Sequence, residues 1–283
     1  MALTDTPKRS EGIPTAPASS GRLAPGRLQD LGWNAALALE IVAIIIVWQV
    51  AIGTFELWNP RFFPPPSEIW GATVAMAESG VLWSNFLASN NNFWIGYLIA
   101  ASTGVTFGLS LGLSSNLRLI LGPLFWTMYA TPRIALQPLL VLWLGFGPGP
   151  KILIIFLMAF FPVAANAMDG VQTVDRSLVR AAQVFGARRL DLYTKVVLPA
   201  ALPFILAGLR MGIARGMVGI VIGEFIGGRE GLGFLILRRS ADFDMAASLA
   251  LTIILVLMAV IGMAVLQFVK RRVAPWHQDE ESF

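Results

Sequence analysis

The sequence contains six apolar stretches, each long enough to cross a lipid bilayer as an α-helix. They cover about residues 33–55, 86–113, 118–145, 150–171, 200–226 and 247–269. About 20 helical residues span roughly 30 Å of hydrocarbon, and inside lipid only helices or closed barrels satisfy every backbone hydrogen bond. The sequence therefore predicts an all-α, polytopic membrane protein with about six transmembrane helices.

The residue types present exclude several kinds of chemistry. The chain is 56% hydrophobic and only 13% charged, it has no cysteine, and its single histidine, His277, lies in a polar segment near the end. Thiolate or histidine sites inside the membrane are therefore excluded, and we expect no catalytic residue, cofactor, metal site or nucleic-acid partner. No glycine-rich loop ends in Gly-Lys-Ser or Gly-Lys-Thr, so we do not expect the chain to hydrolyse ATP.

Composition divides the chain into three segments. Residues 1–32 are rich in Pro, Ser, Gly and Arg, without apolar periodicity, which predicts a disordered cytoplasmic tail. Residues 33–272 hold all the apolar stretches and form the predicted transmembrane domain. Residues 273–283 are polar and form a second cytoplasmic tail.

The distribution of Lys and Arg predicts the orientation in the membrane. With the N-terminus in the cytoplasm, the cytoplasmic side holds four such residues in 1–32, Arg118, five in 176–199 and three in 270–272, thirteen in all. The outer segments hold five, namely Arg61, Lys151, Arg229, Arg238 and Arg239. This asymmetry satisfies the positive-inside rule and places both termini, and residues 176–199, in the cytoplasm.

Residues 176–199 form a polar interruption between two predicted spans. Leu178, Ala181, Ala182 and Phe185 recur at helical spacing, with basic residues off that stripe. Gly186 suits a helix end that needs positive φ. We therefore predict a short amphipathic helix that ends near Gly186, with Asp175 or Ser177 as its N-cap.

A second stripe follows at once, formed by Leu190, Tyr193 and Val197, and it runs into Leu198-Pro199. The segment is therefore expected to form helix, turn and helix. On the residues alone, a basic hairpin lying at the membrane surface explains this pattern as well as a docking element does.

Three motifs resemble those of binding-protein-dependent ABC importer permeases. The order Ala181-Ala182, Gly186 and Leu198-Pro199 resembles the cytoplasmic coupling loop that docks on the ATPase subunit, although Arg180 replaces the usual acidic residue. The run from Glu224 to Gly233, through Gly231, resembles the family's Glu-Phe-x-Gly-x-x-x-Gly-Leu-Gly signature. Residues 63–70 resemble the nitrate, sulfonate, taurine and bicarbonate subgroup.

This resemblance implies a type I importer permease of the bacterial inner membrane, working as a homodimer. The implied partners are two copies of a cytoplasmic ATPase, which binds ATP and Mg, and a periplasmic or lipid-anchored solute-binding protein. The expected function is to form the pathway for a small anionic solute, such as a sulfonate, nitrate, bicarbonate or organic carboxylate. Asn92 stands where the family commonly has arginine.

Ionisable and amide side chains within the spans are the candidates for contact with a transported solute. A charge at the bilayer centre costs about 3 kcal/mol, so such residues mark pathways or pair with one another. The candidates for the pathway or gate are Arg133, Gln137, Asn166, Arg210, Glu224, Gly231 and Gly233. Arg210 and Arg215 are five residues apart, about 140° around a helix, and cannot both face one pore squarely.

Glycines at four-residue spacing predict close helix contacts, either within one subunit or between two. They are Gly104, Gly108 and Gly112, then Gly208, Gly212 and Gly216, and then Gly219, Gly223 and Gly227.

The rival functions are a secondary transporter driven by an ion gradient, and a channel or membrane scaffold. The first would require acidic groups at mid-membrane or an inverted repeat, and we find neither in the sequence.

Overall fold

The computed structural model describes residues 27–273, which are helical with short connections and contain no strand within that range. The helices are α1 (Arg27–Gly53), α2 (Pro66–Glu78), α3 (Val81–Leu113), α4 (Ser115–Ala130), η1 (Arg133–Leu136), α5 (Gln137–Leu144), α6 (Pro148–Gln172), α7 (Arg176–Val184), α8 (Arg189–Leu192), η2 (Tyr193–Val197), α9 (Leu198–Gly227), α10 (Leu232–Ala241) and α11 (Met245–Val273). The all-α prediction is confirmed.

Four helical segments of the described chain have the length and hydropathy to cross a membrane. They are Val81–Leu113, Pro148–Gln172, Arg189–Gly227 and Met245–Arg272. The other two predicted spans correspond to shorter apolar helices, Leu39–Gly53 and Arg133–Leu144. The third span is broken because Pro132 has no N–H to continue α4, and a 3₁₀ turn separates α4 from α5.

The chain divides into two units, the first ending at Trp48 and the second beginning at Gln49. The first unit contains most of α1, with Leu39, Ile41 and Ile44 exposed along it. Residues 27–32 are helical rather than part of a tail, because Arg27, Leu28 and Gln29 favour helix. Val273, predicted to begin the second tail, is the last residue of α11. The remaining residues of the predicted tails, 1–26 and 274–283, lie outside the described residues.

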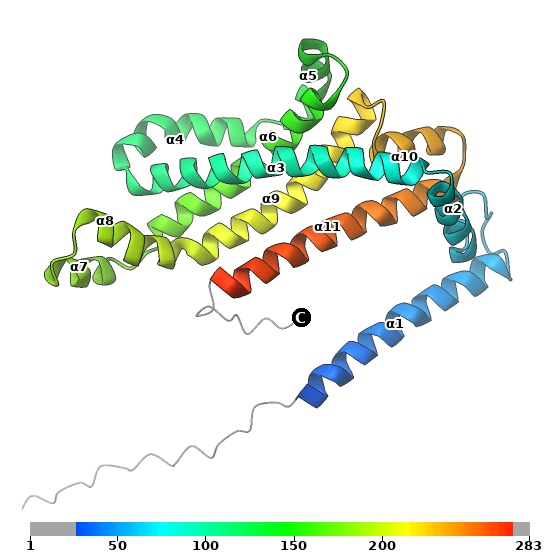
Figure 1. Ribbon diagram of the computed structural model, residues 1–283, viewed down its shortest axis with the longest axis horizontal. Helices are drawn as coiled ribbons and strands as arrows, with labels where there is room; N and C mark the ends of the chain where they lie inside the picture. Colours follow the sequence, from blue (N-terminus) through cyan, green and yellow to red (C-terminus); the bar gives the residue numbers. More distant parts are fainter. Residues whose placement is uncertain (1–26, 274–283) are drawn as a thin grey trace, which may run out of the picture. The chain divides into compact units, whose positions relative to one another are not determined.

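The second unit is organised around α6, which packs against α3 and α9 (Figure 1). Its most apolar stretch is the most buried of the four spanning segments. Ile154, Ala159 and Val163 are fully enclosed. Tyr97 of α3 also donates a hydrogen bond of 3.0 Å to the Leu209 carbonyl of α9. The three helices therefore form one packed layer of the bundle.

The predicted glycine ladders are the contact surfaces of this layer. A Cβ atom on Gly108 of α3 would overlap the Ala164 carbonyl oxygen of α6 and lie 2.8 Å from the Ala167 Cβ. A Cβ on Gly208 of α9 would lie 2.7 Å from the Asn166 Cβ. Since only glycine permits such approach, the ladders pack α3 and α9 against α6 within one chain.

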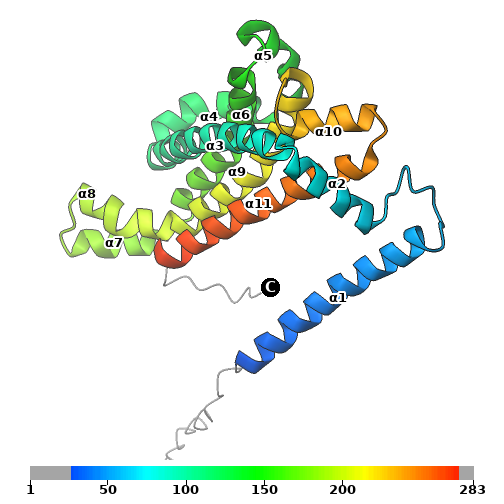
Figure 2. The ribbon, with the colours of Figure 1, turned by 45° about the vertical axis from the view of Figure 1, so that its right-hand side comes forward.

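The arrangement places two connections at opposite ends of α9. Figure 2 shows α7 and α8 at the beginning of α9 and α10 at its end. Because α6 begins beside the end of α9 and runs antiparallel to it, these two helices link both ends of the unit.

We predict that Gly108→Ala destabilises the protein by about 1–3 kcal/mol, the usual cost of inserting a methyl group into a well-packed core. The measurement is the thermal unfolding midpoint of the detergent-solubilised protein. Gly71→Ala on α2 is the matched control, since a Cβ there would meet nothing within 4 Å. Equal midpoints for the two variants would contradict the contact between α3 and α6.

Candidate functional site

We call residues 176–199, which include α7, α8 and η2, the hairpin. It begins with a capped helix, as the sequence predicts. Asp175 is the N-cap of α7, and its Oδ1 accepts a hydrogen bond of 2.7 Å from the Ser177 backbone N–H. Gly186 follows the end of α7 with φ of 81°, the left-handed conformation expected of it. Arg180 and Ala181 are exposed on α7, and Ala182 is half-buried.

The cap makes the start of α7 sensitive to acid. The hydrogen bond from Ser177 lowers the pKa of the Asp175 carboxyl group. A carboxyl with a lowered pKa in the folded state stabilises the fold above its ordinary pKa of about 3.9. This contribution is lost as the pH falls through the lowered, folded-state value.

The second half of the hairpin differs from the prediction, because it is not a separate helix. The turn α8 continues through a π-helical turn, η2, directly into α9, which gives one helical segment from Arg189 to Gly227. In η2 the Leu198 N–H donates to the Tyr193 carbonyl, five residues back. Pro199 has no N–H to offer the Lys195 carbonyl four residues back, which gives a physical reason for the wider turn.

The hairpin exposes apolar side chains. No residue of α7 is buried, and Phe185 and Val184 are 90% and 85% exposed. Leu178 and Leu190 are also exposed. The predicted stripe therefore does not pack on the described part of the bundle, and it forms an apolar surface available for another molecule.

At the other end of α9, a buried carboxylate holds the connection to α10. Glu224 is fully buried. Its Oε1 accepts a hydrogen bond of 2.7 Å from the Ser89 hydroxyl of α3, and its Oε2 accepts one of 2.7 Å from the Gly233 N–H. The Ser89 oxygen in turn accepts a bond of 2.8 Å from the Leu232 N–H. We call Glu224, Ser89 and the 231–233 backbone the carboxylate anchor.

Two further polar contacts reinforce this anchor. The Gly231 N–H donates to Asn85 Oδ1 at 2.7 Å, and Lys151 Nζ donates to the Glu230 carbonyl at 2.9 Å. A side chain at Gly231 would collide with the Glu224 carboxylate, and its φ is 114°, so the position requires glycine.

Sequence reasoning missed three members of this network. The sequence predicts Lys151 only as one of the outer basic residues, whereas the structure buries it, at 1% exposed, within α6. A lysine at the start of an apolar span was the available signal. Ser89 and Asn85 carry no local signal, because their partners lie more than 130 residues away in the chain.

The Arg133 side chain contacts α4 and α6, whereas the Gln137 side chain contacts α9. The Arg133 guanidinium is 5.2 Å from the ring centre of Tyr129 and 5.1 Å from that of Phe161. Its Nη1 donates a long hydrogen bond of 3.4 Å to the Leu157 carbonyl. Gln137 is fully buried and donates to the Gly223 carbonyl of α9 at 3.3 Å.

Asn166 and Arg210 are the remaining predicted pathway residues. The Asn166 amide donates to the Pro162 carbonyl of its own helix at 2.8 Å and to the Met211 sulfur at 3.6 Å. Arg210 is exposed, and no ion pair within residues 27–273 involves it. The structure therefore brings Asn166 to α9, but it does not bring these residues together with Arg133 and Gln137 in one cluster.

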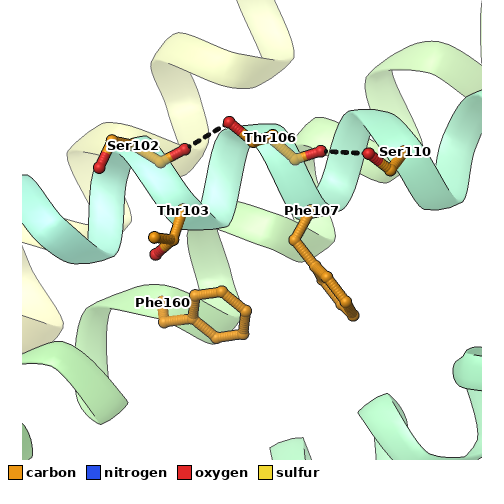
Figure 3. Close-up of a pocket in the computed structure, with 6 residues that line it drawn as sticks. All are labelled: Ser102, Thr103, Thr106, Phe107, Ser110 and Phe160. Atoms are coloured by element: carbon orange, nitrogen blue, oxygen red, sulfur yellow. Dashed lines mark hydrogen bonds between the residues drawn. The ribbon is translucent and has the colours of Figure 1, made fainter.

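A shallow hollow of about 460 Å³ lies on α3 and α6 (Figure 3). Ser102, Thr103, Thr106 and Ser110 line it together with Phe107 and Phe160. Each hydroxyl donates to a carbonyl of α3 three or four residues back, for example Thr106 to Ser102 at 2.8 Å. These hydroxyls are satisfied within their own helix and by themselves indicate no ligand.

The profile of the family described as "Binding-protein-dependent transport system inner membrane component" matches residues 104–275. The chain belongs to this family. It is therefore a multi-pass inner-membrane protein and the permease subunit of an ABC importer.

Two curated relatives support this assignment, and one solved structure shows the same fold. The taurine transport system permease protein TauC of Escherichia coli (strain K12) is 34% identical, over 85% of this chain and 90% of the relative. The putative aliphatic sulfonates transport permease protein SsuC of Bacillus subtilis (strain 168) is 33% identical, over 95% and 96%. A crystal structure of an amino acid ABC transporter with histidines aligns with a TM-score of 0.58 at 16% identity, over 71% of this chain and 98% of that one, which shows a shared fold.

We predict that Ser89→Ala loosens the carboxylate anchor, because it removes a donor to Glu224 and the acceptor of the Leu232 N–H. Leaving such buried groups unpaired costs about 1–3 kcal/mol. Amide hydrogen exchange of residues 228–233 should rise by about tenfold or more.

The matched control for this variant is Ser102→Ala, whose exposed hydroxyl donates only to the Leu98 and Ile99 carbonyls of its own helix. If both serine variants left the exchange of residues 228–233 unchanged, the anchor would not hold this connection.

Proposed function

We propose that this permease works as a homodimer, joined by two copies of a cytoplasmic ATPase and by a periplasmic or lipid-anchored solute-binding protein, and that it imports a small anion. In this proposal ATP and Mg are bound by the ATPase, and the permease itself hydrolyses no ATP. Both termini lie in the cytoplasm, on the side of the hairpin, as the charge asymmetry predicts.

The observation that carries the proposal is the exposed apolar surface of the hairpin. Val184 and Phe185 project from a segment too polar to span the bilayer. Arg180, Arg188 and Arg189 are near them in the sequence, and all three are exposed. An apolar centre with a charged rim is typical of a protein interface. The family membership makes an ATPase the partner of choice, with Ala181, Ala182 and Gly186 shaping the docking turn.

The path from the docking surface into the membrane is a continuous helix. Because α8 and η2 run into α9 through Leu198 and Pro199, a force on the hairpin acts directly on α9. The glycines of α9 press on α6, so the two helices are expected to move together. A hairpin that only lies on the lipid surface would not need this continuity with α9.

The far end of the same helix pair carries the proposed gate. Glu224, Gly231 and Gly233 fix the connection between α9 and α10 against α3, while Gln137 ties α5 to α9. A shift of α9 relative to α3 would strain the bond between Ser89 and Glu224. We therefore propose that the carboxylate anchor forms part of the outer gate, and that the position of α9 controls this gate.

The anionic substrate class rests on the relatives and on charge. The two curated relatives are named for taurine and aliphatic sulfonate transport, and this chain aligns with each over most of its length. The second unit of the chain contains three arginines that have no acidic ion-pair partner within residues 27–273, namely Arg133, Arg210 and Arg215. Unpaired positive charge favours an anion over a cation.

Phe185→Asp tests the docking surface. A charge in the centre of an apolar interface should weaken ATPase binding by at least about tenfold, because central aromatic residues contribute about 2 kcal/mol or more. The thermal midpoint of the permease should stay the same, since Phe185 is 90% exposed. Binding and ATP hydrolysis are measured with the cognate ATPase in lipid nanodiscs.

Phe243→Asp is the matched control, an exposed phenylalanine in the connection between α10 and α11. It should leave ATPase binding at the wild-type level. If the wild-type permease bound no ATPase, or if Phe185→Asp bound it as tightly as wild type, the docking role would be wrong.

A further inference from the structure

We propose that α2 lies in the surface region of the membrane leaflet opposite the hairpin, and that one side of this helix contacts phospholipid there. The contact surface is the exposed apolar side formed by Trp70, Val74 and Ala77, which we call the lipid side of α2. The inference goes beyond the proposed function, because it requires only that the chain spans a membrane.

Two sides of α2 are apolar. Ile69 and Met76 are buried, and α2 packs against α11 and α3, so these two residues form its packed side. At about 100° per residue, the residues of the lipid side fall within about 60° of one another and are centred about 120° from the packed side. Trp70 is 70% exposed and Val74 is 36% exposed. The described chain therefore leaves a second apolar side of α2 uncovered.

The third side of α2 suits contact with water. Glu68, Gly71 and Ala75 lie on it and are exposed, and Glu78 lies at its edge in the last turn. A helix that packs on a bundle in water needs one apolar side and one polar side. A helix that also lies in a membrane surface needs a further apolar side toward the lipid. The three sides of α2 match this second case.

Two hydrogen bonds fix the start of α2 at the end of an apolar helix. The Ser67 N–H donates to Gln49 Oε1 at 3.0 Å, and Gln49 Nε2 donates to the Ser67 hydroxyl at 3.2 Å. Gln49 lies one turn before the end of the apolar helix Leu39–Gly53. Figure 1 shows α2 beside the starts of α3 and α11, at the end of the second unit away from α7 and α8. The depth of α2 is therefore that of the membrane boundary.

The loop before α2 supplies further aromatic side chains. Trp58 and Phe63 are 66% and 52% exposed, and their rings stack with centroids 5.5 Å apart. Tryptophan is enriched at membrane–water interfaces, where its ring meets lipid and its N–H finds a polar partner. Two exposed tryptophans, Trp58 and Trp70, thus flank the start of α2 in the sequence.

Phospholipid is the proposed partner because α2 adjoins an apolar surface that spans the membrane. α11 is one of the spanning segments, and Ile253, Val256 and Val260 are exposed along it. α2 packs on this same helix. Burial of apolar area then holds α2 in the interface. Since α2 contains two Glu and no Lys or Arg, it does not attract anionic headgroups, and zwitterionic phosphatidylcholine should be sufficient.

The test compares two neighbouring positions on different sides of α2. The chain has no cysteine, so a nitroxide label on Val74→Cys or Ala75→Cys reports on that position alone. Both positions are exposed, the first on the lipid side and the second on the water side. The labelled permease is placed in nanodiscs of phosphatidylcholine. Collisions of the label are measured with oxygen, which concentrates among acyl chains, and with a nickel chelate, which stays in water.

The label on Val74→Cys should collide several-fold less with nickel, and more with oxygen, than the label on Ala75→Cys. Its depth should be about 5–10 Å into the boundary between headgroups and acyl chains. Replacing part of the phosphatidylcholine with phosphatidylglycerol should leave this depth unchanged, because no basic residue of α2 takes part.

A second pair of variants repeats the comparison in the first half of the helix. Trp70→Cys is on the lipid side, and Gly71→Cys is on the water side, where an added Cβ meets nothing within 4 Å. A thermal midpoint equal to that of wild type checks that each labelled variant is folded.

The outcomes separate three surroundings of the lipid side. Nickel access that is low at Val74 and Trp70 but high at Ala75 and Gly71, with oxygen access reversed, supports the proposal. Nickel access that does not differ between neighbouring positions would contradict the three-sided arrangement. Low access of both oxygen and nickel at Val74 and Trp70 would show that protein covers this side, and would overturn the proposal. Neither failure would bear on ATPase binding, so the proposed function is tested separately.

Discussion

The close approach of helix backbones to α6 is the constraint on which the rest of the structure depends. In lipid there is no hydrophobic force between helices, so their association relies on packing and on hydrogen bonds. Here Gly108 of α3 and Gly208 of α9 remove the side chains that would keep them away from α6. The resulting layer fixes the register of three helices, and every functional residue takes its position from that register.

Two consequences follow for the ends of the layer. At one end α9 extends without a break into the hairpin, so the exposed Phe185 is connected to the membrane unit through helical turns. At the other end the buried Glu224 binds both α3 and the start of α10. A buried carboxylate is tolerated only when its oxygens are hydrogen-bonded, and both oxygens of Glu224 are.

Features set by local chemistry could be predicted from the sequence, whereas features set by distant partners could not. Hydropathy predicted the apolar stretches, and residue type predicted the Asp175 cap and the positive φ of Gly186. The glycine spacing predicted close helix contacts, but it could not predict which helix each glycine contacts. The bond between Ser89 and Glu224 joins residues 135 positions apart, and no periodicity reveals it. The continuity of α8 with α9 was missed because the polar residues there suggested a separate helix.

The central claim is that α6 and α9 act as one body linking the hairpin to the anchored connection. The chain has no cysteine, so spin labels can be placed at Thr194→Cys, on the exposed start of the continuous helix, and at Glu230→Cys alone. Pulsed electron resonance then measures this distance in a labelled chain diluted with unlabelled chain, in the assembled transporter. We predict the same distance distribution without nucleotide and with ATP trapped. A shift of several ångströms within the chain would show that the helix pair bends, and would contradict this account.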